Sequence, residues 1–225
     1  MTRSARMQRP LAIELAGEDL LLDPAPGLIW PAERTGFIAD THFGKGAVMR
    51  RGGVAVPSGS SRDDLARLSA LIERHALTRL VVLGDFFHAP PMAGEPFVDA
   101  FMAWRRAHDQ LALTVIRGNH DRPAGDALAS VIDWQPEGSR QGPFELRHEP
   151  VTFDLHVLAG HQHPVTTLRG NDGDRARVGV FRCLPGLTIL PAFGGLTGGH
   201  ESVTAPDEHR VVVTPAGLFE LPRPG

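Results

Sequence analysis

The chain has 225 residues and a formal net charge of -3, from 23 lysines and arginines against 26 aspartates and glutamates. This length suits one large α/β domain with a buried core, and the charge excludes a basic field over the whole chain of the kind that nucleic-acid-binding domains carry. The single cysteine, Cys183, excludes an internal disulfide framework, fits a reducing compartment, and is expected to pack as a small apolar residue.

The first ten residues carry three arginines without the apolar run that a secretory signal needs. No stretch approaches the roughly 20 apolar residues that span a bilayer. We therefore expect a flexible arginine-bearing tail over residues 1–10, a single domain over residues 11–225, no membrane contact and a cytoplasmic location.

The first half of the chain is expected to alternate strands with helices. Apolar residues alternate with polar ones through residues 11–22, which predicts a hairpin around Gly17-Glu18-Asp19. Residues 35–39 predict a buried strand that ends on Asp40, and the glycine-rich residues 44–60 predict a loop. Ser61-Arg62-Asp63-Asp64 is typical of a helix N-terminus and precedes apolar residues at helical spacing.

The same alternation continues to the third motif, after which strands dominate. Residues 80–83 and 111–116 predict strands, with a helix over residues 95–109 between them. Phe97, Phe101 and Trp104 fall at helical spacing and are expected in the core. A short helix over residues 126–132 precedes strands predicted at residues 144–147, 153–158, 177–182, 187–190 and 210–213. This order favours a four-layer α/β/β/α sandwich of two mixed sheets, with its site along one edge.

Five short motifs in a fixed order carry the chemistry. They supply carboxylate, amide and imidazole groups, the ligands that divalent metals accept, and the first three follow predicted strands. Two cations held close together need a shared anion, which a carboxylate can provide. The motifs are Asp40-Thr41-His42, Gly84-Asp85-Phe86-Phe87-His88, Gly118-Asn119-His120-Asp121, His148 and Gly160-His161-Gln162-His163.

This set resembles the calcineurin-like metallophosphoesterase superfamily. The residues around the motifs, such as Phe43-Gly44-Lys45 and Leu190-Pro191-Ala192-Phe193-Gly194, look like those of the bacterial ligase-associated DNA damage response phosphodiesterases. The resemblance implies that one metal is held by Asp40, His42, Asp85 and His163. It implies that the other is held by Asp85, Asn119, His148 and His161, with Asp85 as the bridge.

The resemblance also implies an activity. The expected enzyme is a phosphodiesterase in which two metals, most often Mn²⁺ although Fe, Zn and Co accept the same ligands, lower the pKa of a water to give the attacking hydroxide. The expected substrate is DNA, cut by an endonuclease in repair, together with an ATP-dependent DNA ligase, a helicase and an exonuclease. The alternatives are a phosphodiesterase or phosphatase for cyclic or other nucleotides and, less favoured, a metal-binding module without catalysis. The residues leave a homo-oligomer open.

Several side chains need a choice between roles. The resemblance makes His120 a proton donor to the leaving oxygen or a stabiliser of charge on the phosphoryl group. Asp121 is expected to orient His120, with a helix cap before Pro123 as the alternative. The isolated ligand could be His148 or His156, and we choose His148 because Glu149-Pro150 follows it as in the family.

Residues around the motifs are candidates for substrate contact. His88 stands where many relatives have Asp, Asn or Glu, and it either orients a ligand or lines the substrate pocket. Lys45 and Arg122 are candidate phosphate contacts. Arg50 and Arg51 lie in the same loop as Lys45 and are candidates too, with a solvated loop as the alternative explanation. Arg117 is a weaker candidate, because its side chain could point into the sheet layer.

Overall fold

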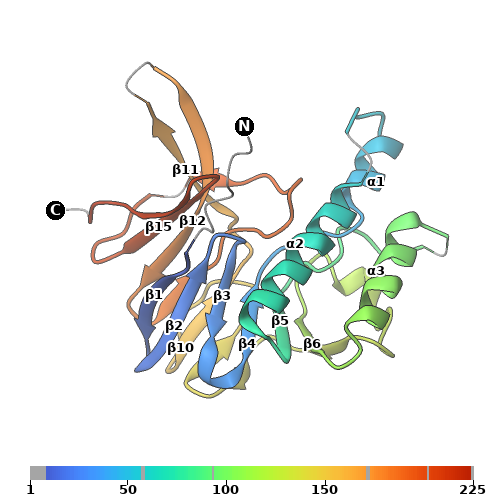
Figure 1. The fold of residues 1–225 in the computed structure, drawn as a ribbon, viewed down its shortest axis with the longest axis horizontal. Coiled ribbons are helices and arrows are strands. Elements are labelled where there is room, and N and C mark those ends of the chain that lie inside the picture. Colours follow the sequence, from blue (N-terminus) through green and yellow to red (C-terminus); the bar gives the residue numbers. More distant parts are fainter. Residues whose placement is uncertain (1–8, 57–58, 93, 171–172, 202, 224–225) are drawn as a thin grey trace, which may run out of the picture.

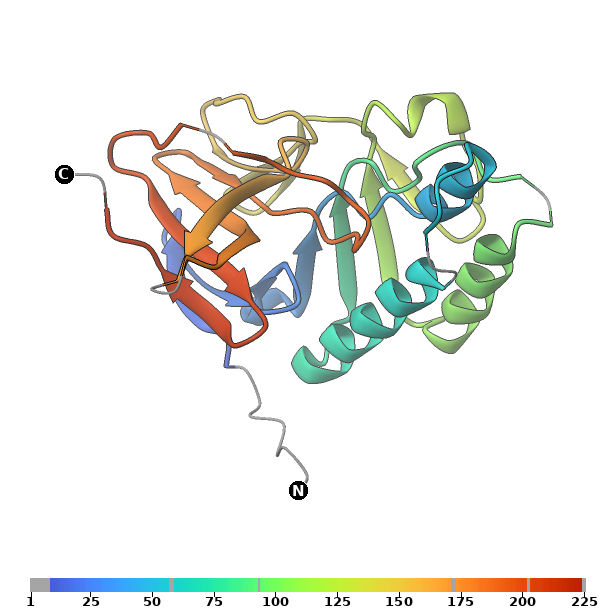
Figure 2. The same cartoon turned by 90° about the horizontal axis from the view of Figure 1, so that it is seen from above.

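The computed structural model describes residues 9–56, 59–92, 94–170, 173–201 and 203–223. Two mixed β-sheets pack face to face, as Figures 1 and 2 show. Most of the predicted tail lies outside the described residues, and the single domain over residues 11–225 stays a prediction. Within the described residues, no helix is long and apolar enough to cross a membrane.

The first sheet contains seven strands in chain order. Its first four strands pair in antiparallel fashion, and from the fourth strand onward the pairing is parallel. The strands are β1 (Leu11–Leu15), β2 (Glu18–Asp23), β3 (Gly27–Trp30), β4 (Thr35–Ile38), β5 (Arg79–Leu83), β6 (Ala112–Ile116) and β7 (Asp133–Gln135).

The second sheet is built from residues 139–220. Its main path runs β14-β11-β12-β13-β10-β9-β8, with β15 paired to β12 and β16 paired to β15. The strands are β8 (Ser139–Gln141), β9 (Phe144–Leu146), β10 (His156–Ala159), β11 (Pro164–Arg169), β12 (Arg175–Leu184), β13 (Leu187–Ile189), β14 (His200–Glu201), β15 (His209–Thr214) and β16 (Gly217–Glu220).

The central strands of the first sheet are buried on both faces. Phe37 and Val81 pack between the two sheets with Phe144 and Phe181 of the second sheet. Ile38, one residue after Phe37, packs on the opposite face under the helices. Successive side chains of a strand point to opposite faces, and here both faces are covered. These strands are therefore continuous apolar runs in the sequence.

Helices α2 (Ser60–His75) and α3 (Pro96–Ala107) cover the outer face of the first sheet (Figure 2). Phe97, Phe101 and Trp104 of α3 are buried there, as predicted. The predicted sandwich of two mixed sheets is confirmed. Of its four predicted layers, the described residues form the two sheets and the helix layer on the first sheet, and no α-helix of the described residues covers the outer face of the second sheet (Figure 2).

Two local predictions are wrong. The predicted loop over residues 44–60 contains helix α1 (Lys45–Arg51), a short helix that packs its buried Gly46 near Ser60 and Leu196. A seven-residue helix is marginal in isolation, and tertiary packing can stabilise it. The predicted helix over residues 126–132 is a series of turns, because Leu128 has a φ of 58° that an α-helix excludes.

The start of α2 also differs in detail from the predicted cap. Gly59 occupies the N-cap with a φ of 105°, and no side chain caps the helix there. The helix itself is confirmed, and its apolar stripe Leu65, Leu68, Leu71 and Ile72 is buried. Two 3₁₀ turns, Pro31–Glu33 and Arg122–Ala124, complete the helical elements of the described chain.

Candidate functional site

Both sheets deliver polar motifs to the same edge. Asp40, Asp85 and Gly118 follow the parallel neighbours β4, β5 and β6 within two residues of the strand ends. From the second sheet, His148 follows β9 and His161 follows β10, which pair in parallel. Parallel strands end at one edge, so motifs separated by more than 100 residues in sequence meet there.

The backbone at the site is held in an unusual conformation. Five of the predicted ligands have positive φ, which is uncommon for residues other than glycine. Such conformations persist where surrounding contacts enforce them, and they cluster at functional sites. The five are Asp40 (53°), His42 (45°), Asp85 (50°), His161 (68°) and His163 (44°).

Backbone hydrogen bonds join the first two motif loops. The amide of Asp40 donates to the carbonyl of Gly84 at 3.2 Å, and the amide of His42 donates to the carbonyl of Asp85 at 2.9 Å. The hydroxyl of Thr41 donates to the carbonyl of Phe86 at 2.9 Å. The two loops therefore fix each other and set the separation of Asp40 and Asp85.

Two motif glycines permit the close approach of ligand side chains. A Cβ on Gly118 would lie 2.2 Å from Oδ1 of Asp85, and a Cβ on Gly84 would lie 2.1 Å from Nδ1 of His148. Gly84 also has a φ of 79°, which favours glycine. No other residue fits these two positions without moving Asp85 or His148.

One group of four side chains has the composition of a metal site. One donor atom from each of Asp40, His42, Asp85 and His163 lies within 4.8 Å of the others. Oδ1 of Asp40 is 3.2 Å from Nε2 of His163, and Nε2 of His42 is 3.7 Å from Oδ2 of Asp85. Oδ1 of Asp40 is buried without a hydrogen-bond partner, a cost that a cation would remove. The residues therefore fit a divalent ion.

A second group surrounds His148, which is 1% exposed. Its Nε2 lies 2.9 Å from Oδ1 of Asn119, 2.9 Å from Nδ1 of His161 and 3.4 Å from Oδ1 of Asp85. Nδ1 of His148 lies 3.2 Å from the carbonyl of Leu83, which fixes the ring. This arrangement brings together the four side chains that the resemblance assigns to a second metal.

His156, the alternative to His148, lies away from these groups. Its Nε2 lies 2.9 Å from the hydroxyl of Thr188, and its ring contacts Phe144 edge-on. The geometry therefore favours His148, with His156 as a hydrogen-bonded residue of the second sheet.

The imidazole of His42 is electrically neutral. Burial, reinforced by the neighbouring His163 and Lys45, lowers the pKa of His42 to about 2. A neutral ring keeps a lone pair for a metal, and Nε2 is the nitrogen that faces Asp85 and His163.

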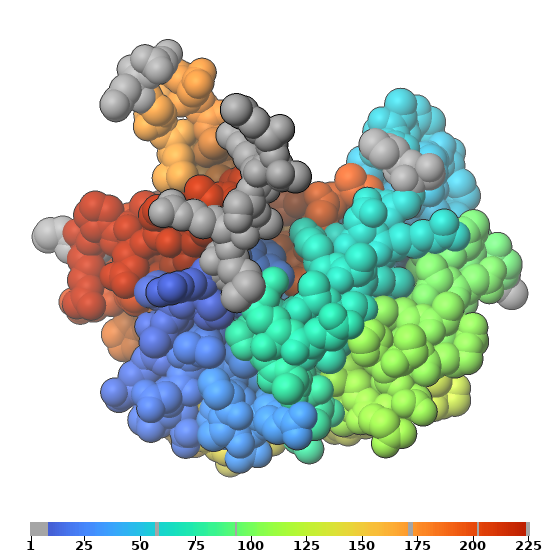
Figure 3. Space-filling model, in the orientation of Figure 1, coloured from blue at the N-terminus to red at the C-terminus, as the bar shows by residue number. Residues whose placement is uncertain are grey.

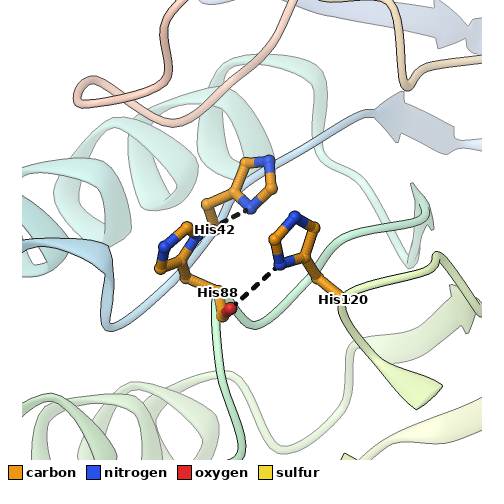
Figure 4. Close-up of side chains that lie close together, drawn as sticks. All are labelled: His42, His88 and His120. Atoms are coloured by element: carbon orange, nitrogen blue, oxygen red, sulfur yellow. Dashed lines mark hydrogen bonds between the residues drawn. The ribbon is translucent and has the colours of Figure 1, made fainter. Parts of the chain in front are cut away.

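His42 also belongs to a cluster with His88 and His120, drawn in Figure 4. Nδ1 of His42 lies 3.5 Å from Nδ1 of His88. The rings of His88 and His120 are stacked at 5.1 Å, and Nδ1 of His120 lies 3.0 Å from the carbonyl of His88. Burial, with Lys45 and His120 nearby, lowers the pKa of His88.

The predicted orientation of His120 by Asp121 is wrong, since the carbonyl of His88 fills that place. The carboxylate of Asp121 is buried and accepts hydrogen bonds from the amides of Phe87 at 3.0 Å, Gly118 at 3.0 Å and Phe86 at 3.2 Å. Nor does the side chain cap the following turn. Asp121 instead joins the second motif loop to the third, and sequence proximity to His120 gave no sign of this.

The basic candidates lie in different surroundings. Lys45 lines a small cavity with His42, and burial lowers the pKa of Lys45. Arg122 is exposed in the turn after Asp121. Arg51 pairs with Glu95 at 2.5 Å, and Arg117 pairs with Asp126 and lies over the ring of Trp134.

Sequence reasoning missed a buried ion pair behind the last motif. The guanidinium of Arg182 donates to both oxygens of Glu208, at 2.5 and 3.0 Å, and to Oε1 of Gln162 at 3.3 Å. Gln162 stands between His161 and His163, so this pair supports the loop that carries both histidines. Arg182 and Glu208 are 26 residues apart, and no local pattern connects them.

The chain is similar to known proteins in sequence and in overall structure. A model of the calcineurin-like phosphoesterase family matches residues 33–211. The crystal structure of the Pseudomonas putida nuclease MPE is 36% identical with a TM-score of 0.83, and the match covers 95% of this chain and 100% of that one. The structure of YfcE, a phosphoesterase from E. coli, is 14% identical with a TM-score of 0.40 over 80% of this chain and 88% of that one. No curated protein matches the sequence.

The family match and the likeness to the Pseudomonas putida nuclease agree with the geometry of the site. The family match spans all five motifs, and the donor group around Asp40 and Asp85 suits divalent metals. The chain therefore belongs to the calcineurin-like phosphoesterases and is a metal-dependent phosphoesterase.

Proposed function

We propose that the protein is a two-metal phosphodiesterase that cuts DNA. The observation that carries the two-metal part is the position of Asp85 between the two donor groups. Its Oδ2 faces His42 at 3.7 Å and its Oδ1 faces His148 at 3.4 Å. A carboxylate with one oxygen toward each group is placed to bridge two cations and to offset their repulsion.

Each metal has its own set of protein donors in this proposal. Asp40, His42, Asp85 and His163 would hold one cation, and Asp85, Asn119, His148 and His161 would hold the other. When bound, two such cations polarise phosphoryl oxygens and lower the pKa of water. Mn²⁺ is the proposed metal, and the mixed oxygen and imidazole donors also accept Fe, Zn and Co.

His120 is the proposed proton donor to the leaving oxygen. With Nδ1–H donated to the carbonyl of His88, Nε2 is the nitrogen left to face the substrate. His88 is proposed to orient His42, because a hydrogen bond at Nδ1 of His42 leaves its Nε2 lone pair for a metal. Lys45 and Arg122 are proposed phosphate contacts beside the centre.

The DNA part of the proposal is supported by the likeness to the Pseudomonas putida nuclease, over 95% of this chain. We infer an endonuclease of DNA repair in the cytoplasm, acting with an ATP-dependent ligase, a helicase and an exonuclease. Hydrolysis of cyclic or other nucleotides is the competing activity.

The test compares substrates on one preparation. Mn²⁺-loaded protein is incubated with circular single-stranded DNA, with bis(p-nitrophenyl) phosphate and with a cyclic nucleotide. We expect DNA to be linearised, two Mn²⁺ per chain by elemental analysis, and loss of both the second metal and activity in Asp85→Ala. The exposed Asp109→Ala is the matched control and is expected to behave as wild type.

Two results would contradict parts of the proposal. Rapid turnover of the cyclic nucleotide without DNA cleavage would replace the DNA substrate by a small molecule. One Mn²⁺ per chain in a fully active enzyme would refute the bridging role of Asp85.

A further inference from the structure

A two-stranded arm projects from the second sheet. It consists of β11 and the first half of β12, residues 164–169 and 175–179, and Figures 1 and 3 show it extending beyond the body on the side where α1 extends. β14 pairs only with Pro164 and Val165, and β15 pairs with β12 only from Val180 onward. Between those points the described hairpin has no third strand.

Three arginines share one face of the arm. The register places Arg169 directly opposite Arg175, and Arg177 opposite Thr167. Because side chains alternate along a strand, Arg175 and Arg177 lie on the same face, together with Arg169. All three residues are exposed. Arg177 donates to the carbonyl of Gly199, and among the described residues no carboxylate pairs with Arg169 or Arg175.

A like-charge pair directly across two strands destabilises a hairpin. A hairpin without a third strand has little stability to spare. Asp174 precedes β12 in the turn between the two strands, and among the described residues it forms no ion pair with Arg169 or Arg175. A bound polyanion would relieve the like-charge pair.

The arginine face looks toward the metal-centre side of the sandwich. Phe181 and Cys183 are an even number of residues from Arg175 and Arg177 along β12, so all four side chains lie on the same face of the strand. Phe181 and Cys183 pack between the two sheets. The arginine face therefore continues the face of β12 that is turned toward the first sheet. β11 begins directly after His163, so Arg169 lies within about 20 Å of that residue along the strand, at about 3.3 Å per residue.

We propose that this arm binds the phosphate backbone of DNA next to the bond that is cut. The proposal rests on the DNA-cutting function proposed above and adds the surface that holds the flanking duplex. A reach of about 20 Å corresponds to about six base pairs, since each strand carries one phosphate per 3.4 Å of helix axis. Arg169 and Arg175 contact phosphates at that distance, and Arg177 contacts one nearer the centre.

The test is the double variant Arg169→Gln/Arg175→Gln in the Mn²⁺-loaded protein. The readout is kcat/KM for cutting a long duplex at about 50 mM and about 200 mM salt, the range over which phosphate contacts are lost. Each phosphate contact contributes about 0.9 to the salt slope, so wild-type kcat/KM should fall about 12-fold more across that range than the value of the variant. Hydrolysis of bis(p-nitrophenyl) phosphate should be unchanged.

The control Arg79→Gln/Arg106→Gln removes the same charge from exposed positions at the start of β5 and on α3. It is expected to keep the wild-type salt slope. Thermal melting checks the fold, and removing the like-charge pair should leave the melting temperature of the arm variant unchanged or raised.

The outcomes separate the arm from the proposed function. If wild type cuts DNA and the arm variant does so with the same kcat/KM and salt slope, the arm proposal is overturned and the nuclease stands. If wild type hydrolyses the small diester but cuts neither duplex nor single-stranded DNA, both fall. If wild type cuts single-stranded DNA but no duplex, the arm proposal is overturned and the nuclease stands. An equal loss in the control variant would overturn the arm proposal too, because it would show an effect of net charge alone.

Discussion

Replacing Asp121 by asparagine tests whether this residue acts on His120 or holds the loops around it. The carboxylate is fully buried, and its two oxygens accept three backbone amides: Oδ1 from Phe87, and Oδ2 from Phe86 and Gly118. An asparagine side chain has one oxygen and one NH₂ group. Whichever way the amide turns, at least one backbone N–H meets a donor.

The cost follows from these contacts. One buried N–H without an acceptor costs about 1–3 kcal/mol, and reducing two hydrogen bonds from a charged to a neutral acceptor costs about 1 kcal/mol each. The asparagine carries no charge to desolvate, and burial raises the pKa of Asp121 against the pull of the three amides, so part of the cost is offset. We expect a net loss of about 2–4 kcal/mol, which lowers the melting temperature by about 4–16 °C in a chain of this size.

The assay is thermal unfolding by circular dichroism, with bis(p-nitrophenyl) phosphate hydrolysis and Mn²⁺ content measured on the same samples. Asp109→Asn, at an exposed position, is the control and should melt within about 1 °C of wild type. The reasoning is refuted if Asp121→Asn melts like the control and keeps its metals while hydrolysis collapses. That result would return Asp121 to a direct role toward His120.

Two further predictions concern the interior of the second sheet. Burial raises the pKa of the Cys183 thiol to about 12. Ellman's reagent should therefore not label the native protein at about pH 8 and should label one thiol after denaturation. Labelling of the native protein would contradict the buried position of Cys183. Arg182→Met removes the ion-pair partner of the buried Glu208 and leaves the amide of Ala205 as its hydrogen-bond donor, which should destabilise the protein by about 3–5 kcal/mol at about pH 7. Adding Glu208→Leu should recover most of the loss. Burial alone would raise the pKa of Glu208, but hydrogen bonds from Arg182 and Ala205 outweigh burial and lower this pKa. The ion pair therefore stabilises the folded protein above the ordinary carboxyl pKa, and this stabilisation is lost as the pH falls through the lowered pKa. The difference between wild type and Arg182→Met in urea unfolding should therefore shrink toward about pH 4, and a constant difference would refute the ion-pair explanation.

The strands and helices that carry the first three motifs could be read from local patterns. Residues 80–83 and 111–116 are apolar runs because both faces of β5 and β6 are covered, and the stripe on α2 has helical spacing because one face packs on the sheet. Helix α1 could not be predicted in this way, because glycines flank and interrupt its seven residues, and a helix of that length depends on tertiary packing, here near Ser60 and Leu196.

The residue types of the site could be predicted from the sequence, because hard metals bind only a few kinds of side chain. Motif order and resemblance led us to expect seven ligands together, and the structure brings them to one edge of the sheets. They are Asp40, His42, Asp85, Asn119, His148, His161 and His163. The choice of His148 over His156 needed the fold, since both residues precede the last motif and only the structure places one of them 2.9 Å from Asn119.

The sequence by itself determined the class of chemistry, because ligand identity and the strand ends that carry the ligands are local properties. Tertiary structure decided what each neighbour does. It gave His120 the carbonyl of His88 as a partner in place of Asp121, tied Gln162 to Arg182, and set Arg169 against Arg175. These relations depend on which loops pack together and on strand register, and contacts between distant segments leave no mark in local periodicity.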